Sequence, residues 1–304
     1  MLRIASIGEC MIELSESSEA GGRMQRTFGG DTLNTAVYLA RSLRDSAAAV
    51  HYVTALGDDP FSEEMLAGWQ AEGLNTRLVA RLPGRLPGLY IIRTDAGGER
   101  SFHYWRSAAA ARELLRDGRA ESLTDALVGF DLVYLSAITL GILDPDSRER
   151  LFALLEALRR GGCRIAFDSN YRPRLWPDRA AAREAASRAY GLAAFALPTF
   201  EDEAALFDDA DAHATARRLH ALGVAEVAVK RGSEPCLVST ADGAQALVAV
   251  ERPVRPVDTT AAGDSFNAAY LAARLSGAAP AAAAAAGHRL AGRVIAARGA
   301  IVPT

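Results

Sequence analysis

The chain contains 304 residues, of which 50% are hydrophobic and 23% charged, and this ordinary globular composition excludes a disordered chain. The formal net charge of -3 argues against a nucleic-acid partner, which would require a basic face. The same charge provides no overall field that attracts anions, so an anionic substrate would have to be held by individual arginines.

Short strands and helices alternate in the first third of the chain. A strand is expected over residues 3–7, and a helix follows over 32–43, with Asp31 as its N-cap. Turn residues at 96–99 separate two strand-like segments, which predicts a β-hairpin. The remaining elements expected here are strands over 51–55, 75–82, 88–94 and 100–106 and a helix over 61–72.

After residue 107 strands and helices alternate regularly, as is typical of βαβ units around a parallel sheet. Two antiparallel strands and two helices complete the chain. The sequence therefore predicts a doubly wound α/β core that carries a small β appendage from the N-terminal third. The strands are expected over 131–136, 164–168, 193–197, 224–230, 236–240 and 246–251, and the helices over 146–160, 178–190, 212–222, 264–275 and 280–298.

Residues 126–143 are nearly all apolar and about as long as a membrane-spanning helix. Gly129, Asp131 and Gly141 interrupt the run, and its centre is short and rich in β-forming residues. A fully buried parallel strand explains this pattern better than a membrane span, so no membrane partner is expected.

The three cysteines, Cys10, Cys163 and Cys236, are too few and too scattered for a disulfide framework or a zinc site. They are interpreted as reduced, buried thiols. The N-terminal residues lack the architecture of a signal peptide. Together these features predict a cytoplasmic protein.

Several common nucleotide-binding motifs are absent. A phosphate-binding Walker loop needs a lysine after glycine, but the only lysine, Lys230, follows Val229. The first strand runs into Gly8 without the G-x-G-x-x-G of a dinucleotide fold. The five histidines show no metal-ligand spacing, and no metal role is assigned to His51, His103, His213, His220 or His288.

Residues 258–264 combine a bare loop with an acidic residue. Ala261, Ala262 and Gly263 directly precede a helix expected to begin near Asp264, so free backbone N–H groups and the positive helix end form an anion cradle. An acid in the first helical turn is usually only a cap. Here three small residues leave the backbone open to a phosphate, and phosphoryl transfer needs charge stabilisation plus one base.

Residues 258–266 (DTTAAGDSF) resemble the signature of the ribokinase-like (PfkB) carbohydrate kinases, and residues 28–36 (FGGDTLNTA) resemble the N-terminal glycine motif of the same family. Together with the order of elements, the resemblance covers essentially the whole chain. Residues 104–106 (YWR) and 168–176 (DSNYRPRLW) resemble in particular those family members that phosphorylate 2-keto-3-deoxygluconate.

The resemblance implies one ribokinase-like domain over residues 1–304, with a mostly parallel sheet and a β lid from segments near 10–30 and 75–106. It implies that ATP, with Mg²⁺, phosphorylates the 6-hydroxyl of 2-dehydro-3-deoxy-D-gluconate. Asp264 would be the base, and the backbone of Ala261–Gly263 the anion hole. The expected partners are the sugar acid and ATP, and a homo-oligomer is expected.

Seven residues are expected to bind the sugar. Tyr104 and Arg106 lie two apart on one strand and share a face, and the hairpin places Tyr90 beside them. An arginine suits the carboxylate of a sugar acid because it can bind bidentately. Arg172 follows a core strand, where open α/β sheets bind ligands. The resemblance adds Gly30, Asp31 and Asn34. Without the resemblance, Gly30 is also explained as part of a turn before the helix and not as a sugar-binding residue.

The resemblance also places residues near the nucleotide. Asp168, Ser169 and Asn170 would lie close to the ATP phosphates, together with Gly263 of the anion hole. Lys230, Gly232 and Ser233 end another core strand, and the same segment of the family lies beside the nucleotide. From the residues alone, the glycine and serine indicate only a loop.

One segment departs from the family pattern. Family members usually carry Asn-x-x-Glu after the strand that here ends at Leu197, whereas this chain has Thr199 and Asp202 at the two positions. That motif is associated with the Mg²⁺ and phosphate environment, so the metal-supporting residues stay open. The acidic residues at 201–203 also fit a negatively charged first helical turn.

Three functions remain open from the sequence. The chain could phosphorylate 2-keto-3-deoxygluconate, or another sugar such as fructose, ribose or the 2-keto-3-deoxygalactonate epimer. It could also be a non-catalytic sugar-binding protein on the same fold. A neutral sugar would leave Arg106 and Arg172 without an anion to pair, and an intact Asp264 argues against a non-catalytic protein. No residue distinguishes the epimers.

Overall fold

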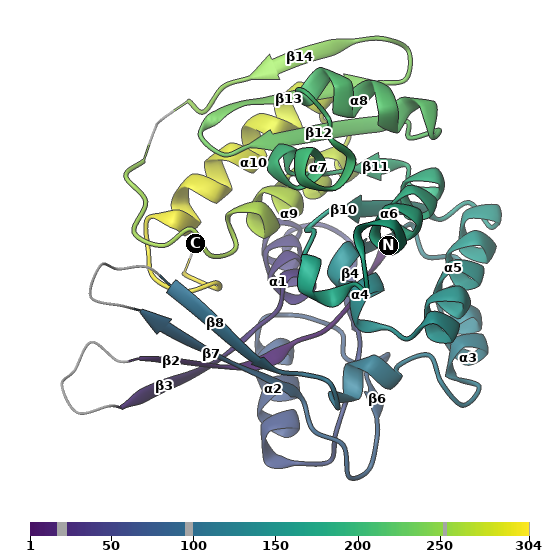
Figure 1. The fold of residues 1–304 in the computed structure, drawn as a ribbon, viewed down its shortest axis with the longest axis vertical. Helices are drawn as coiled ribbons and strands as arrows, with labels where there is room; N and C mark the ends of the chain where they lie inside the picture. Colours follow the sequence, from purple (N-terminus) through teal and green to yellow (C-terminus); the bar gives the residue numbers. More distant parts are fainter. Residues whose placement is uncertain (17–22, 95–99, 252–253, 304) are drawn as a thin grey trace.

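The structure, a computed structural model, describes residues 1–16, 23–94, 100–251 and 254–303. Within these residues one eight-stranded sheet, the main sheet, forms the centre of the molecule (Figure 1). Six neighbouring strands, β12, β11, β10, β9, β1 and β4, are parallel. Strands β13 and β14 extend the sheet beyond β12 and pair antiparallel. In spatial order the strands are β14 (Gln245–Val248), β13 (Glu234–Thr240), β12 (Glu226–Arg231), β11 (Phe195–Ala196), β10 (Arg164–Asp168), β9 (Leu132–Ser136), β1 (Leu2–Ile7) and β4 (Ala48–Val53).

Helices cover both faces of the main sheet, and each face has its own apolar cluster. One cluster is formed with α1 (Asp31–Ser42), α2 (Pro60–Ala71), α9 (Ala262–Leu275) and α10 (Pro280–Ile295). The other is formed with α3 (Arg119–Leu127), α4 (Ala137–Ile142), α5 (Pro145–Arg160), α6 (Arg179–Leu192), α7 (Phe200–Phe207) and α8 (Ala212–Ala221). This is the doubly wound arrangement that the alternation of elements predicts.

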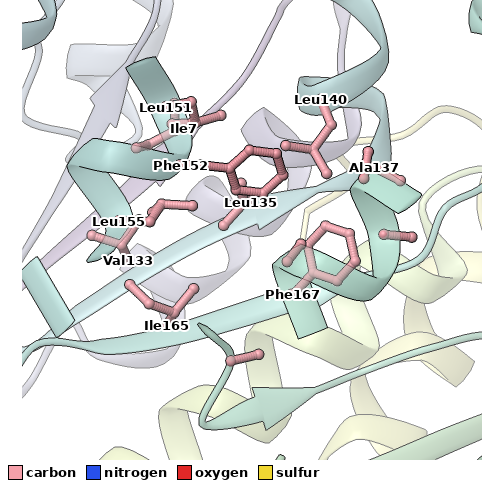
Figure 2. Packing of buried hydrophobic residues seen from close by; sticks show 14 of the residues in the cluster. Ile7, Val133, Leu135, Ala137, Leu140, Leu151, Phe152, Leu155, Ile165 and Phe167 are labelled. Atoms are coloured by element: carbon pink, nitrogen blue, oxygen red, sulfur yellow. The ribbon is translucent and has the colours of Figure 1, made fainter. Parts of the chain in front are cut away.

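Strand β9 explains the apolar run at residues 126–143. Val133 and Leu135 pack into one cluster, and Leu132 and Tyr134 into the other, so both faces of the strand are buried. Figure 2 shows Leu135 beside Phe152 and Val133 beside Leu155, both of α5. The expectation of a buried strand is confirmed, and among the described residues no helix is long and apolar enough to cross a membrane.

A second sheet of four strands, called here the small sheet, projects from the body (Figure 1). Its order is β3 (Met24–Gly29), β2 (Met11–Glu16), β7 (Gly88–Thr94) and β8 (Arg100–Trp105). The antiparallel pair β7 and β8 confirms the predicted hairpin strands, and the turn expected at 96–99 lies outside the described residues. The small sheet draws its strands from the segments expected to form the β lid.

The strand predicted over residues 75–82 is wrong for most of its length. Only β6 (Ala80–Arg81) forms there, paired with β5 (Ala55–Leu56). The Asn75 side chain accepts a hydrogen bond from the backbone N–H of Arg77 at 3.0 Å, and the N–H of Val79 donates to the carbonyl of Thr76 at 3.0 Å. These local turns take up backbone groups that a strand would need for pairing.

Several element boundaries also differ from the sequence analysis. Strand β14 ends at Val248, three residues before the predicted end, and α10 ends at Ile295 where the pattern predicted 298. Helices α3 and α4 were not predicted, and α7 was indicated only by the acids at 201–203, which fit a first helical turn. The three cysteines are free and buried, as expected.

Candidate functional site

Two helix N-termini that are far apart in sequence meet at one place. Asn34, in the first turn of α1, donates a 2.8 Å hydrogen bond from Nδ2 to Oδ2 of Asp264, in the first turn of α9. Both side chains are buried. The two motifs singled out in the sequence, residues 28–36 and 258–266, therefore form one site.

Asp264 is a buried acid surrounded by other acids. Its pKa is raised from 3.8 to about 7. Burial is the largest cause and the charges of Asp31 and Asp168 add to the rise, while the hydrogen bond from Asn34 and the charge of Lys230 act in the opposite direction. A carboxyl group with a pKa near neutrality can accept a proton and release it at physiological pH.

The loop before Asp264 has an unusual backbone. Ala261, the residue that precedes α9, lies in the left-handed region with φ of 60°, and no side chain of the described residues caps the helix. A non-glycine residue in this region carries strain that the surrounding structure must hold. The uncapped N–H groups and the helix dipole make this end of α9 suited to an anion.

The only lysine of the chain lies beside this helix end. Lys230 is buried at the end of β12, and its Nζ donates to Oδ2 of Asp168 at 3.1 Å and to Oδ1 of Asn267 at 2.9 Å. Asn267 donates in turn to Asp168 at 2.7 Å and to the hydroxyl of Tyr134 at 3.1 Å. A β-carbon added at Gly263 would lie 3.5 Å from Nζ, so the ammonium group borders the anion cradle.

The residues after β10 connect to α1 and to the segment after β11. Asn170 donates from Nδ2 to Oδ2 of Asp31 at 2.7 Å, and the backbone N–H of Thr199 donates to the hydroxyl of Ser169 at 3.2 Å. Asn170 itself has a positive φ of 24°. These contacts bring the predicted sugar-binding Asp31 and the predicted nucleotide-binding residues into one constellation.

Two neighbouring acids of α7 have different surroundings. Asp202 accepts a hydrogen bond from the N–H of Tyr171 at 3.2 Å and lies 3.8 Å from Nη1 of Arg172. Burial raises its pKa, and the charge of Arg172 counteracts that rise. Glu203 is fully buried between Tyr190 and Arg218 and faces away into the protein core. Asp202 is therefore the acid of this segment that belongs to the site.

The small sheet contributes an aromatic pair. Tyr90 and Tyr104 are register partners, with ring centroids 5.7 Å apart in a stacked arrangement, and Ile91 pairs with His103. The expectation that the hairpin places Tyr90 beside Tyr104 is confirmed, and Ile91 points to the opposite face because adjacent side chains on a strand alternate. The Tyr90 hydroxyl donates to Glu13, and burial and that carboxylate raise the pKa of Tyr90.

Arg106 is engaged by an acid that the sequence analysis did not select. Its Nη2 donates to Oε2 of Glu9, which follows strand β1, and the side chain of Glu9 is 1% exposed. The guanidinium group also lies over the ring of Tyr104, 5.7 Å from its centroid. Arg106 thus has one side already occupied by an intramolecular carboxylate.

Glycine residues at this junction are needed for close packing of the backbone. A β-carbon at Gly30 would lie 2.2 Å from the carbonyl oxygen of Glu9, and one at Gly29 would lie 2.4 Å from the hydroxyl of Tyr90. Gly30 has extended backbone geometry, so the close approach and not a special φ requires glycine. This explanation lies within the protein and needs no ligand.

A cavity of about 720 Å³ lies where the small sheet joins the body. Its lining combines aromatic, small and basic side chains from β8, the following loop, α4 and the segment after Arg172. Arg174 lines the cavity and makes no ion pair within the described residues. Tyr104, Arg106, Arg112, Arg174 and Gly141 are among the residues that line it.

The structure brings most of the predicted site residues together, with two exceptions. Gly232 and Ser233 form the exposed turn between β12 and β13, and their contact with a nucleotide stays a prediction. The sequence analysis missed Glu9, Glu13, Tyr134 and Asn267, which act through partners distant in sequence. Among the described residues, no group of three or more His, Cys, Asp or Glu side chains converges as a metal site.

Comparison with known proteins identifies relatives over the whole chain. The family model described as pfkB family carbohydrate kinase matches residues 1–304. The chain is 50% identical over 302 residues to 2-dehydro-3-deoxygluconokinase of Dickeya dadantii (strain 3937), covering 99% of this chain and 96% of that protein. It is 48% identical over 303 residues to 2-dehydro-3-deoxygluconokinase of Escherichia coli (strain K12), covering 99% and 97%.

The fold is similar to a solved structure of a putative ribokinase II from E. coli in complex with ATP and Mg²⁺. That structure superposes with a TM-score of 0.85 at 20% identity, and the match covers 99% of this chain and 94% of the other. At this identity the likeness shows the fold alone. It confirms the predicted ribokinase-like, doubly wound arrangement with its mostly parallel sheet.

Proposed function

The chain belongs to the pfkB family of carbohydrate kinases, and from that premise we propose that it transfers the γ-phosphoryl group of ATP to the 6-hydroxyl of 2-dehydro-3-deoxy-D-gluconate. One observation carries the chemical part of this proposal. Asp264, a carboxyl group with a pKa of about 7, lies at the uncapped N-terminus of α9. A base and an anion cradle are thereby adjacent.

The proposed step uses Asp264 as a general base. The oxygen of the 6-hydroxyl attacks the γ-phosphorus of ATP, and the bond between that phosphorus and the β–γ bridging oxygen breaks as ADP leaves. The hydroxyl proton passes to the Asp264 carboxylate. The hydrogen bond from Asn34 at 2.8 Å holds the carboxylate in place while its other oxygen receives the proton.

Charge stabilisation would come from the first turn of α9 and from Lys230. The N–H of Ala262 already donates to the carbonyl of Thr259 at 3.2 Å, so the helix dipole and the N–H of Gly263 are the parts of this turn that we assign to the charge on the transferred phosphoryl group. Lys230 borders Gly263, and Asp168 and Asn267 fix its direction. A fixed cation costs little reorganisation during the reaction, which is the condition for effective electrostatic stabilisation.

The residues present also fit Mg²⁺. Oδ1 of Asp168 is buried without a partner among the described residues, and Asp202 is a second carboxylate whose burial raises its pKa. Oxygen ligands from one or two carboxylates plus substrate phosphates are what Mg²⁺ prefers. We assign Asp202 and Asp168 as the residues that would hold it, where it would neutralise charge on the ATP phosphates.

The basic residues around the cavity at the small sheet favour a sugar acid over a neutral sugar; Asp31, Asn34 and Asp264 are not among the described residues that line this cavity. Arg106, Arg112 and Arg174 line it, and Glu9 is the one carboxylate hydrogen-bonded to them among the described residues. Arg172 adds a further positive charge beside Asp202. The names of the relatives at 48% and 50% identity support the same substrate class.

A substrate panel tests this proposal. The purified protein is supplied with MgATP and, separately, with 2-dehydro-3-deoxygluconate, its galactonate epimer, fructose and ribose, and ADP release is measured. The gluconate-derived acid is expected to give the highest kcat/KM. Equal or higher kcat/KM for fructose or ribose would contradict the proposed substrate, and no turnover with any sugar would favour a non-catalytic sugar-binding protein.

The raised pKa of Asp264 predicts a pH dependence. A base must be deprotonated to act, and its pKa is about 7. We expect kcat/KM for the sugar acid to be constant above that pH and to fall about tenfold per pH unit below it. Initial rates from pH 5.5 to 9 measure the profile, and a flat profile between pH 5.5 and 8 would contradict the role of Asp264.

The two neighbours on β7 provide a matched pair of variants. Tyr90→Ala is expected to raise KM for the sugar acid, because it removes the ring stacked on Tyr104 and the hydroxyl held by Glu13. Ile91→Ala, on the opposite face, is expected to lower the melting temperature with little change in KM. Equal changes of KM in the two variants would show that Tyr90 does not face the substrate.

A further inference from the structure

The ion pair between Glu9 and Arg106 joins the body of the protein to the small sheet. Glu9 lies two residues after the end of β1 in the main sheet, and Arg106 directly follows β8. The pair is tightly enclosed, because a β-carbon at Gly88 would lie 3.0 Å from Oε1 of Glu9 and 3.2 Å from Cβ of Arg106. Gly30 also packs against the backbone of Glu9. The pair is therefore built into the site.

The guanidinium group of Arg106 has its nitrogens in three different situations. Nη2 donates to Glu9, and Nε is buried without a partner among the described residues. Nη1 makes no hydrogen bond within the described residues and is not fully buried. Nη2 and Nε are thus committed within the protein, and Nη1 is the nitrogen of Arg106 that remains for a ligand.

We propose that Glu9 is a positioning residue that fixes the guanidinium group of Arg106, so that Nη1 meets the carboxylate of the sugar acid. This inference rests on the proposed function and deepens it. A long arginine side chain loses conformational entropy when it is held in one rotamer. Because the buried ion pair already fixes Arg106 in the free protein, substrate binding does not have to supply that entropy loss. Arg106 then binds the substrate carboxylate through one terminal nitrogen, Nη1, and not through two.

The energetics of Glu9 fit this role. Burial raises the pKa of Glu9, and the charges of Arg106 and Arg112 counteract that rise. A buried carboxylate destabilises the folded protein unless a cation pairs with it, so Glu9 needs a cationic partner at this position. Arg106 is that partner, and it borders the predicted sugar-binding Tyr104.

The first test is Glu9→Gln, which keeps the shape of the side chain and removes its charge. We expect KM for the sugar acid to rise about 5- to 30-fold and kcat to stay within about twofold, since charge-assisted hydrogen bonds are roughly twice as strong as neutral ones. The matched control is Glu64→Gln. Glu64 of α2 pairs at 2.5 Å with Arg26 of β3, another contact between the body and the small sheet, and KM should not change.

A double-variant cycle separates positioning from a structural role. In the background of Arg106→Leu, Glu9→Gln should leave KM unchanged, because Glu9 acts only through Arg106. The double variant should also melt at a higher temperature than Arg106→Leu alone, which leaves the Glu9 charge buried and unpaired.

Two results would overturn the role of Glu9 as a positioning residue. A further rise of KM in the double variant, or a Glu9→Gln variant with a lowered melting temperature and unchanged KM, would overturn the inference. Failure of the proposed function is distinguishable from both outcomes, because the wild-type chain would then lack activity on the sugar acid.

Discussion

Asp264→Asn is expected to abolish turnover while the sugar acid still binds. The amide preserves the size of the side chain and can accept the hydrogen bond that Asn34 donates at 2.8 Å, but it cannot take up the proton of the sugar hydroxyl. Loss of a general base typically lowers the rate by roughly 10²–10⁴-fold. Single-turnover kinetics measure the rate, and calorimetric titration measures sugar binding.

A stability measurement on the same variant guards against misfolding. The pKa of Asp264 is 3.8 when exposed and about 7 in the folded protein. Between these values the folded state holds a proton that the unfolded state has released, so this group lowers the free energy of unfolding as pH rises through that window. At pH 8 the Asn variant should therefore melt at the same temperature as the wild type or higher. A kcat within a few-fold of the wild type would contradict the assignment.

Arg106→Leu is expected to lose activity selectively on the sugar acid. Hydrogen bonds to charged groups contribute roughly 1.5–3 kcal/mol, so kcat/KM for the acid should fall about 10- to 100-fold, and much less for a neutral sugar of similar length. Activity on both substrates is compared at equal ATP. Arg106→Lys should recover part of the loss, because an ammonium group cannot hold Glu9 and the substrate in the fixed planar geometry of a guanidinium.

The buried partner of Arg106 must be included in that comparison. Removing Arg106 alone leaves Glu9 unpaired in a position where its side chain is 1% exposed, and a general loss of folded protein would lower both activities. The double variant Glu9→Gln, Arg106→Leu removes this effect. If it loses both activities by the same factor, Arg106 does not read the carboxylate, and Arg172 becomes the better candidate.

Regular patterns in the sequence predicted the parts of the fold that depend on local chemistry. The buried strand β9 and the hairpin of β7 and β8 follow from apolar runs and alternation, and both are present. The strand predicted over 75–82 failed because the Asn75 side chain forms a local turn, which a β-rich composition does not reveal. Helix α7 has three acids in its first turn, a pattern that the sequence analysis related to a helical turn and also to the motif of the Mg²⁺ environment, so it did not define the helix.

The site was predictable where its residues lie in short motifs. Asp264 and the small residues before it form a recognisable loop, and Asn34 lies in the other glycine motif. The contacts between Glu9 and Arg106 and between Lys230 and Asn267 were not predictable, because they join distant segments and leave no periodic pattern. Only the fold shows that these residues meet.

Identification of the phosphorylated carbon tests the central claim most directly. The purified protein is incubated with MgATP and 2-dehydro-3-deoxy-D-gluconate, and the product is examined by two-dimensional ¹H–³¹P NMR. A single phosphomonoester coupled to the protons on C6, formed in equal amount to ADP, is the predicted result. A phosphate on another carbon, or ADP formation that does not depend on the sugar acid, would contradict it.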